Sequence, residues 1–136
     1  MSIGETILDM VRDAVPGVAV YDGRVPDQHE TPGVPPARYV VVYVNDPHRV
    51  AEDVGHTSSG GAVHWQVSCV APDRAMASWL ATTIRDAIVD VRPAAAGWSC
   101  GLVEHSVSLR PRADEAVQER PAVLVVDQYE LLVERT

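Results

Sequence analysis

Apolar residues near the N-terminus recur at the three- and four-residue spacing of a helix. They are Ile3, Ile7, Leu8, Val11, Ala14 and Val15, and the charged residues between them fall on the opposite side. Ser2 and Glu5 form an S-x-x-E capping box at the start, and Pro16 with Gly17 ends the pattern. The spacing predicts an amphipathic helix that docks on another element.

Three segments carry the apolar pattern of β-strands. Residues 18–22 form a short run, residues 38–45 read RYVVVYVN, and residues 62–71 alternate apolar with polar side chains. We predict that the second and third pair as a hairpin. Its tip, residues 47–61, is so long that it is either functional or disordered in the isolated protein. Four prolines between residues 25 and 36 favour an extended loop there.

The clearest helical pattern follows Pro72, with Asp73 as N-cap and Arg92-Pro93 as its end. A continuous apolar stripe is predicted to face the core: Met76, Trp79, Leu80, Thr83, Ile84, Ala87, Ile88 and Val91. Residues 100–109 then alternate as one strand, with one face made of Val103, His105, Val107 and Leu109. After a charged loop over residues 111–121, residues 122–134 are apolar enough for a strand inside a sheet.

This order, α-β-β-β-α-β-β, predicts a single α+β domain over residues 1–136. An antiparallel or mixed β-sheet would carry two helices packed on one face. A chain of 136 residues can bury a core without disulfides or metal. We expect Trp65 and Trp79 to be core residues, and Cys69 and Cys100, within strand-like apolar runs, to be buried free thiols.

The charge balance argues against a protein that grips nucleic acid. Nineteen acidic residues oppose eleven basic ones, all arginine, which gives a formal net charge of −8. Affinity for phosphates comes from clustered basic side chains, and no such cluster is seen. No apolar run approaches the length of a membrane span, and the acidic N-terminus is unlike an export signal, so we expect synthesis in the cytoplasm and no membrane partner.

Catalytic and metal-binding motifs are not recognisable. A hydrolytic triad could be imagined from a small set of residues, which comprises His64, His105, Ser68, Ser106 and Asp127. However, no G-x-S-x-G elbow is present, and histidines on strand faces are ordinarily half-exposed or hydrogen-bonded. His29, His48 and His56 lack metal-ligand spacing, and a chain without lysine cannot form a Walker phosphate loop. We therefore expect no enzymatic activity, no metal and no cofactor.

A patterned core with charged loops and no recognisable chemistry is typical of an interaction or assembly protein. Trp98, between Gly97 and Ser99, is expected to be partly exposed and able to anchor a contact. A cyclic ring needs two different complementary patches on each subunit, and loops of mixed charge offer them. The candidate subunit or partner contacts are Arg49, Glu52, Asp53, Trp98, Arg110, Arg112, Asp114 and Glu115.

The order of elements resembles the tail terminator, or tail completion, proteins of long-tailed bacteriophages. The resemblance runs through the N-terminal helix, RYVVV at 38–42, WQVSC at 65–69, the helix over 77–88 and DQYEL at 127–131. It implies a homo-oligomeric ring, a hexamer in that family, that caps the tail tube in the virion and joins it to the head-side connector protein. DNA would pass through without specific binding, as an acidic wall allows. The proline-rich segment 26–36 and the charged loops depart from the family pattern.

Two alternatives stay open. Another head-tail neck or connector component would share the lack of chemistry but cap a different partner. A small enzyme of unrecognised type would instead depend on a single residue such as His105 or Asp127 for turnover.

Overall fold

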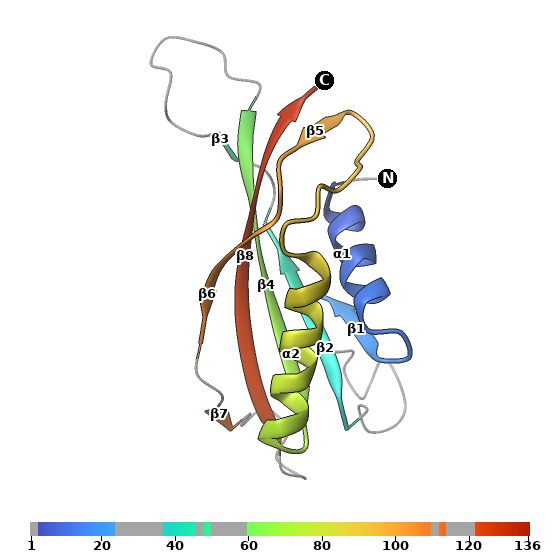
Figure 1. Cartoon of the computed structure of the whole chain (residues 1–136), viewed down its shortest axis with the longest axis vertical. Coiled ribbons are helices and arrows are strands. Elements are labelled where there is room, and N and C mark those ends of the chain that lie inside the picture. Colours follow the sequence, from blue (N-terminus) through green and yellow to red (C-terminus); the bar gives the residue numbers. More distant parts are fainter. Residues whose placement is uncertain (1–2, 24–36, 46–47, 50–59, 110–111, 114–121) are drawn as a thin grey trace.

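Two helices cover one face of a mixed β-sheet in the computed structural model of the chain (Figure 1). The structure describes residues 3–23, 37–45, 48–49, 60–109, 112–113 and 122–136. The α+β class, the mixed sheet and the packing of both helices on one face are confirmed. The predicted capping serine, the proline-rich loop and most of both charged loops lie outside the described residues.

The sheet is organised around two long antiparallel strands, β4 (Gly60–Ala71) and β8 (Val123–Arg135), which pair over the whole of β4. On one side β2 (Tyr39–Val44) runs antiparallel to β4, and β1 (Ala19–Asp22) runs parallel to β2. The predicted hairpin of residues 38–45 and 62–71 is therefore confirmed. The short strand β3 (His48–Arg49) also pairs with β4.

On its other side β8 pairs with three short strands in succession. These are β5 (Trp98–Cys100), β6 (Glu104–Ser108) and β7 (Arg112–Ala113), all antiparallel to β8. Because β8 has neighbours along both edges, it needs apolar residues over much of its length. Its predicted place inside the sheet is confirmed.

The main core lies between the sheet and the helices α1 (Ile3–Ala14) and α2 (Arg74–Ile88). From α1 it takes Ile3, Ile7, Leu8 and Val11, as the sequence spacing predicted. From the strands it takes alternate residues, such as Val63, Trp65, Val67 and Cys69 of β4. Both cysteines are free and buried, and the predicted N-cap is confirmed, because the Asp73 side chain accepts a bond of 2.8 Å from the Met76 amide.

The opposite side of the sheet, here called the outer face, has two unlike parts. Tyr39, Val41 and Val70 form a second buried apolar cluster around the start of β2. Farther along the strands the same face carries polar side chains, among them Gln66 and Gln128. The polar part of this face forms the candidate functional site.

Helix α2 differs from its predicted boundaries and orientation. It ends at Ile88 with Val89 as C-cap, before the predicted Arg92-Pro93, and Asp90 then adopts the left-handed conformation with φ 64°. The buried stripe is Ala77, Leu80, Ala81, Ile84 and Ile88. Trp79, predicted to be core, is 52% exposed, and Ala87 and Val91 are exposed too. The helix is rotated so that small alanines, rather than the indole, face the sheet.

The predicted strand over residues 100–109 is wrong as a single element. Residues Gly101–Val103 separate β5 from β6. The Gly101 amide still donates a hydrogen bond to the Leu132 carbonyl, whereas the backbone of Val103 is hydrogen-bonded to Asp90 and Val91. Inside β6 a bulge lies between His105 and Val107, which pair with Tyr129 and Gln128 respectively. Because one extra residue reverses the alternation, Val107 moves to the outer face instead of following His105.

No helix within the described ranges has both the length and the apolar character needed to cross a membrane.

Candidate functional site

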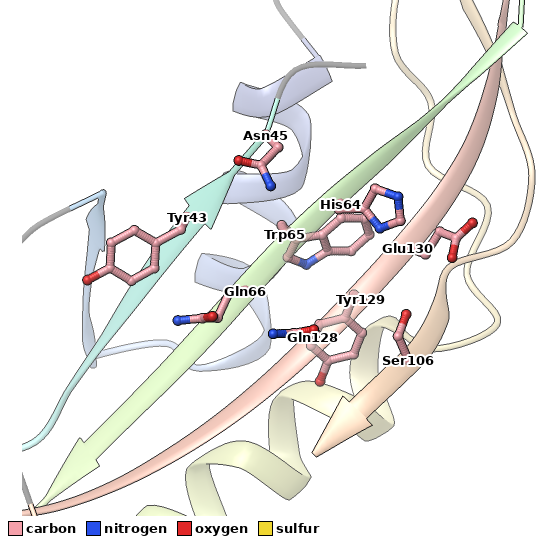
Figure 2. A pocket seen from close by; sticks show the side chains of 9 residues that line it. All are labelled: Tyr43, Asn45, His64, Trp65, Gln66, Ser106, Gln128, Tyr129 and Glu130. Carbon is pink, nitrogen blue, oxygen red and sulfur yellow. The ribbon is translucent and has the colours of Figure 1, made fainter. Parts of the chain in front are cut away.

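The polar part of the outer face is hollowed into a groove of about 620 Å³. Figure 2 shows the groove crossing four strands, from Tyr43 and Asn45 at the end of β2, over β4 and β8, to Ser106 of β6. The remaining lining residues are His64, Trp65, Gln66, Gln128, Tyr129 and Glu130. Since side chains alternate along a strand, the even-numbered residues of β4 and β8 point into this space while Trp65 and Tyr129 turn toward the helices (Figure 2).

Two cross-strand rows build the floor of the groove. In the first row Tyr43, Gln66 and Gln128 lie opposite one another, which sets a phenol beside two carboxamides. In the second row His64 lies opposite Glu130, and Glu130 lies opposite Glu104. Like charges directly opposite in a sheet are unfavourable, so the Glu130 and Glu104 pair makes this side of the groove a place that attracts a cationic partner.

Apolar side chains surround these rows. Tyr43 is 43% exposed, Val107 43% and Leu132 55%. Val107 pairs with Gln128, and Leu132 pairs with Ala62 on the same face. A surface that combines exposed aromatic and aliphatic groups with amides and carboxylates has the composition of a protein contact.

A buried ionic cluster lies on the other side of the sheet, beneath α2. Asp127 of β8 is 2% exposed in its side chain. One nitrogen of the Arg85 guanidinium donates to both of its carboxylate oxygens, at 2.9 and 3.0 Å, and His105 Nε2 lies 3.2 Å from Oδ1. A buried carboxylate is tolerated only with such partners. The cluster therefore fastens α2 and β6 to β8.

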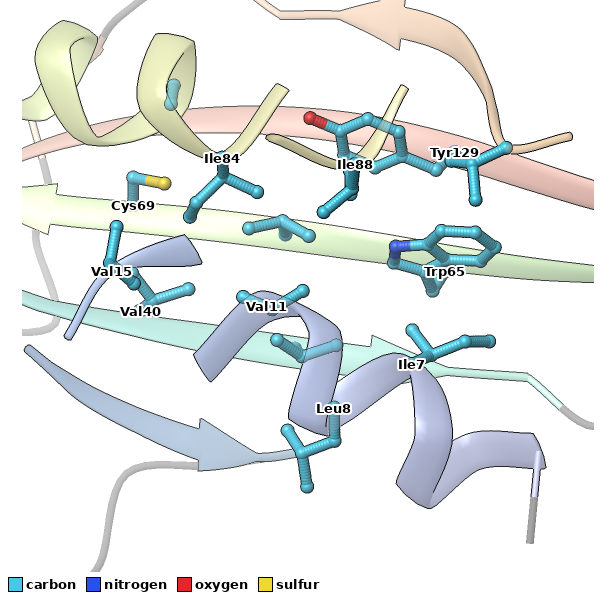
Figure 3. Close-up of a cluster of buried hydrophobic side chains, with 14 of the residues drawn as sticks. Ile7, Leu8, Val11, Val15, Val40, Trp65, Cys69, Ile84, Ile88 and Tyr129 are labelled. Atoms are coloured by element: carbon cyan, nitrogen blue, oxygen red, sulfur yellow. The ribbon is translucent and has the colours of Figure 1, made fainter. Parts of the chain in front are cut away.

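Burial controls the ionisation of the groups around this cluster. Burial acts to lower the pKa of Arg85, but the hydrogen bond and negative charge of Asp127 outweigh it and the pKa is raised. Burial, with the charge of Asp127, raises the pKa of Tyr129 and raises that of Cys69 to about 12. Tyr129 stacks on Trp65 with ring centroids 5.6 Å apart, and both project into the core (Figure 3). Near neutral pH the Cys69 thiol and the Tyr129 phenol therefore stay protonated, and the Arg85 guanidinium stays charged.

The imagined hydrolytic triad is not assembled. His105 and Asp127 do meet, but Ser68 bonds to Gln66 and Ser106 lines the groove, both on the outer face. The sheet thus separates these two hydroxyls from the histidine. Ser108, which does lie on the helix side, accepts a 3.4 Å bond from Arg85. The predicted behaviour of the histidines, half-exposed or hydrogen-bonded, is confirmed for His105 and His64.

None of the predicted contact residues is among the described residues that line the groove. Trp98 is partly exposed, as predicted, and the Arg135 guanidinium lies 5.1 Å from its ring centroid. The backbones of Arg49 and Arg112 belong to β3 and β7. Outside the described residues lie Glu52, Asp53, Arg110, Asp114 and Glu115. Within the described part of the chain, no group of three or more His, Cys, Asp or Glu residues is placed to hold a metal ion.

Sequence reasoning missed the groove and the role of Arg85. The signal for the groove was present, since Tyr43, Gln66 and Gln128 occupy the polar positions of strands whose alternate positions are core. Recognising it required the register that brings these three residues into one row. Arg85 gave no signal, because an arginine on a helix ordinarily faces water.

Comparison with solved structures identifies relatives in fold. A chain in the virion of a native gene transfer agent particle superposes with a TM-score of 0.66 at 20% identity, over 98% of this chain and 95% of that one. A second solved structure gives a TM-score of 0.53 at 15% identity, over 93% and 88%. No family model and no curated protein sequence matches. The chain thus has the same fold, over nearly its whole length, as a chain of the gene transfer agent virion.

Proposed function

We propose that this protein is a structural component of a phage or phage-like virion. Within it, the protein acts as a tail terminator that caps the tail tube as a ring, ends tail polymerisation and joins the tail to the head-side connector. The observation that carries the proposal is the shared fold across 98% of this chain and 95% of the gene transfer agent chain. The match spans almost the whole length of both chains.

The surface chemistry is consistent with an assembly role rather than catalysis. The outer groove combines exposed Tyr43 and Val107 with carboxamides and carboxylates. The one His-Asp contact in the described residues is occupied by Arg85 and lies away from the serines that line the outer face. A net charge of −8 suits the wall of a conduit that DNA crosses without being held.

The test is the solution mass of the purified protein by light scattering over a range of concentrations, with and without tail tubes, together with electron microscopy of the tubes. We expect a hexamer, or a monomer that forms rings at one end of each tube. A protein that ignores tubes but binds an isolated head connector would identify another neck component instead. A protein that binds neither would contradict the virion role.

The enzyme alternative makes a different prediction. If His105 and Asp127 served catalysis, His105→Ala would abolish a turnover while leaving ring formation intact. Both carboxylate oxygens of Asp127 accept hydrogen bonds from Arg85. This ion pair argues against a catalytic role, because the carboxylate already neutralises the charge of the arginine.

A further inference from the structure

Among the residues that the structure describes, the formal charges on the open outer groove and at its edge are negative. Glu104 and Glu130 lie opposite each other, and no described arginine lines the groove. Neither carboxylate makes an ion pair with another described residue. Tyr43 and Val107 supply exposed apolar area beside them. The partner that fits is therefore a surface with apolar groups and two or more cations.

A second surface of this same chain has that character. Arg38, just before β2, and Arg74, the first residue of α2, are both exposed. Arg38 lines a hollow of about 530 Å³, and Arg74 follows the lining residue Asp73 in the chain. The other lining residues are mostly apolar or small: Gly17, Ala19, Ala37, Pro72 and Met76. The Asp73 carboxylate accepts a hydrogen bond from the Met76 amide as the N-cap of α2. Neither Arg38 nor Arg74 forms an ion pair with another described residue.

The two surfaces lie at different places on the molecule. Figure 1 shows α2 beginning at the end of the sheet where β2 begins, while Tyr43 and Asn45 mark the other end of β2. From Arg38 to Tyr43 the strand extends about 17 Å. One surface belongs to the outer face and the other to the end of the helical side, so a single chain cannot bring its own two surfaces together.

We propose that copies of this chain associate head to tail, with the outer groove of one copy, called the acidic surface, receiving the Arg38 and Arg74 end of the next, called the basic surface. Glu104 and Glu130 would face the two guanidinium groups, and Met76 would pack near Tyr43. Different, complementary surfaces are what a ring with cyclic symmetry requires. The inference rests on the proposed ring and names the residues that hold it together.

The test uses two complementary variants and their mixture. Variant one is Glu104→Arg with Glu130→Arg, and variant two is Arg38→Glu with Arg74→Glu. Each alone brings like charges together, so each should assemble only at a concentration at least about tenfold higher than the wild type. Mixed in equal amounts, the two variants can alternate. The reversed groove of variant one then meets the reversed end of variant two, and the unaltered groove of variant two meets the unaltered end of variant one, so every contact joins opposite charges and assembly should return. Light scattering measures this in solution, or microscopy of tube ends where assembly needs the tube.

A matched control separates specific contacts from net charge. Asp13→Arg with Asp86→Arg reverses two exposed acids on the helices and changes the net charge by the same amount as variant one. It should assemble like the wild type. Thermal unfolding of every variant checks that the fold is retained.

The outcomes are distinguishable. Rings formed equally well by the wild type and both variants would overturn the assignment of these surfaces while leaving the tail terminator proposal standing. Failure of the mixture to recover, or recovery only as a two-chain particle, would overturn the head-to-tail arrangement. A wild-type protein that forms no assembly with or without tubes would overturn both proposals.

Discussion

At the scale of single residues, Asp127 is the one buried acidic residue of the described structure. Its carboxylate is buried, and it is held by Arg85 from α2 and His105 from β6. Removing one partner of a buried ion pair leaves an uncompensated charge, which costs far more than removing both. The cluster therefore links three elements through one side chain.

Arg85→Ala should lower the free energy of unfolding by about 2–4 kcal/mol, somewhat less than for a fully buried pair because the Arg85 side chain is 33% exposed. The double variant Arg85→Leu with Asp127→Leu should recover much of that loss. Urea denaturation measures both. Arg74→Ala, at an exposed position of the same helix, should stay within about 0.5 kcal/mol of the wild type. A change of no more than about 0.5 kcal/mol for Arg85→Ala as well would mean that the cluster does not stabilise the fold.

Cys69 gives the fold a sensitivity to alkaline pH. Its pKa is raised from 9.0 to about 12 by burial, so the folded state keeps the proton that the unfolded state loses. Its contribution to stability is complete below about pH 9 and is lost as the pH rises toward 12. Cys69→Ala should make the alkaline decline shallower by up to about 1.4 kcal/mol per pH unit. Urea titrations between pH 8 and pH 11 measure this, and Val67→Ala should keep the wild-type slope.

At the scale of elements, the orientation of α2 is set by side-chain packing against the sheet and not by the apolar stripe in the sequence alone. The apolar stripe in the sequence was wide enough to allow two orientations, one with Trp79 inward and one with Ala77 and Ala81 inward. The second lets the helix axis approach the sheet more closely, because alanine is small, and it leaves the indole outside.

This orientation predicts unequal costs for neighbouring substitutions in α2. Trp79→Ser should change the free energy of unfolding by no more than about 0.5 kcal/mol, because the indole is 52% exposed. Leu80→Ala should cost about 2–5 kcal/mol, since Leu80 is fully buried. Thermal and urea unfolding compare the two. A large loss for Trp79→Ser with a normal fold would mean that the helix is turned as the sequence pattern first suggested.

At the scale of the whole molecule, the charged segments of the sequence supply further candidate contacts for assembly, in addition to the acidic and basic surfaces. We predict that Glu52→Arg with Asp53→Arg weakens assembly more than folding, because charge reversal acts on contacts between subunits rather than on an apolar core. Light scattering and thermal unfolding of the double variant measure the two effects. Unchanged ring formation would remove this loop from the assembly surface.

What the sequence alone determined follows from local and periodic signals. The period of 3.6 residues located both helices, Asp73 marked the start of α2, and alternation located β2, β4 and β8. These are properties of neighbouring residues and of which side of an element meets water. The α+β class and the free buried cysteines could therefore be predicted without coordinates.

Only the tertiary structure decided the features that depend on register and on which elements meet. The bulge in β6 moved Val107 to the outer face, and strand pairing set Glu130 opposite Glu104 and placed Tyr43, Gln66 and Gln128 in one row. Arg85 reached Asp127 across 42 residues of chain. Such contacts join residues far apart in sequence, so no local spacing contains them, and the candidate site is made of them.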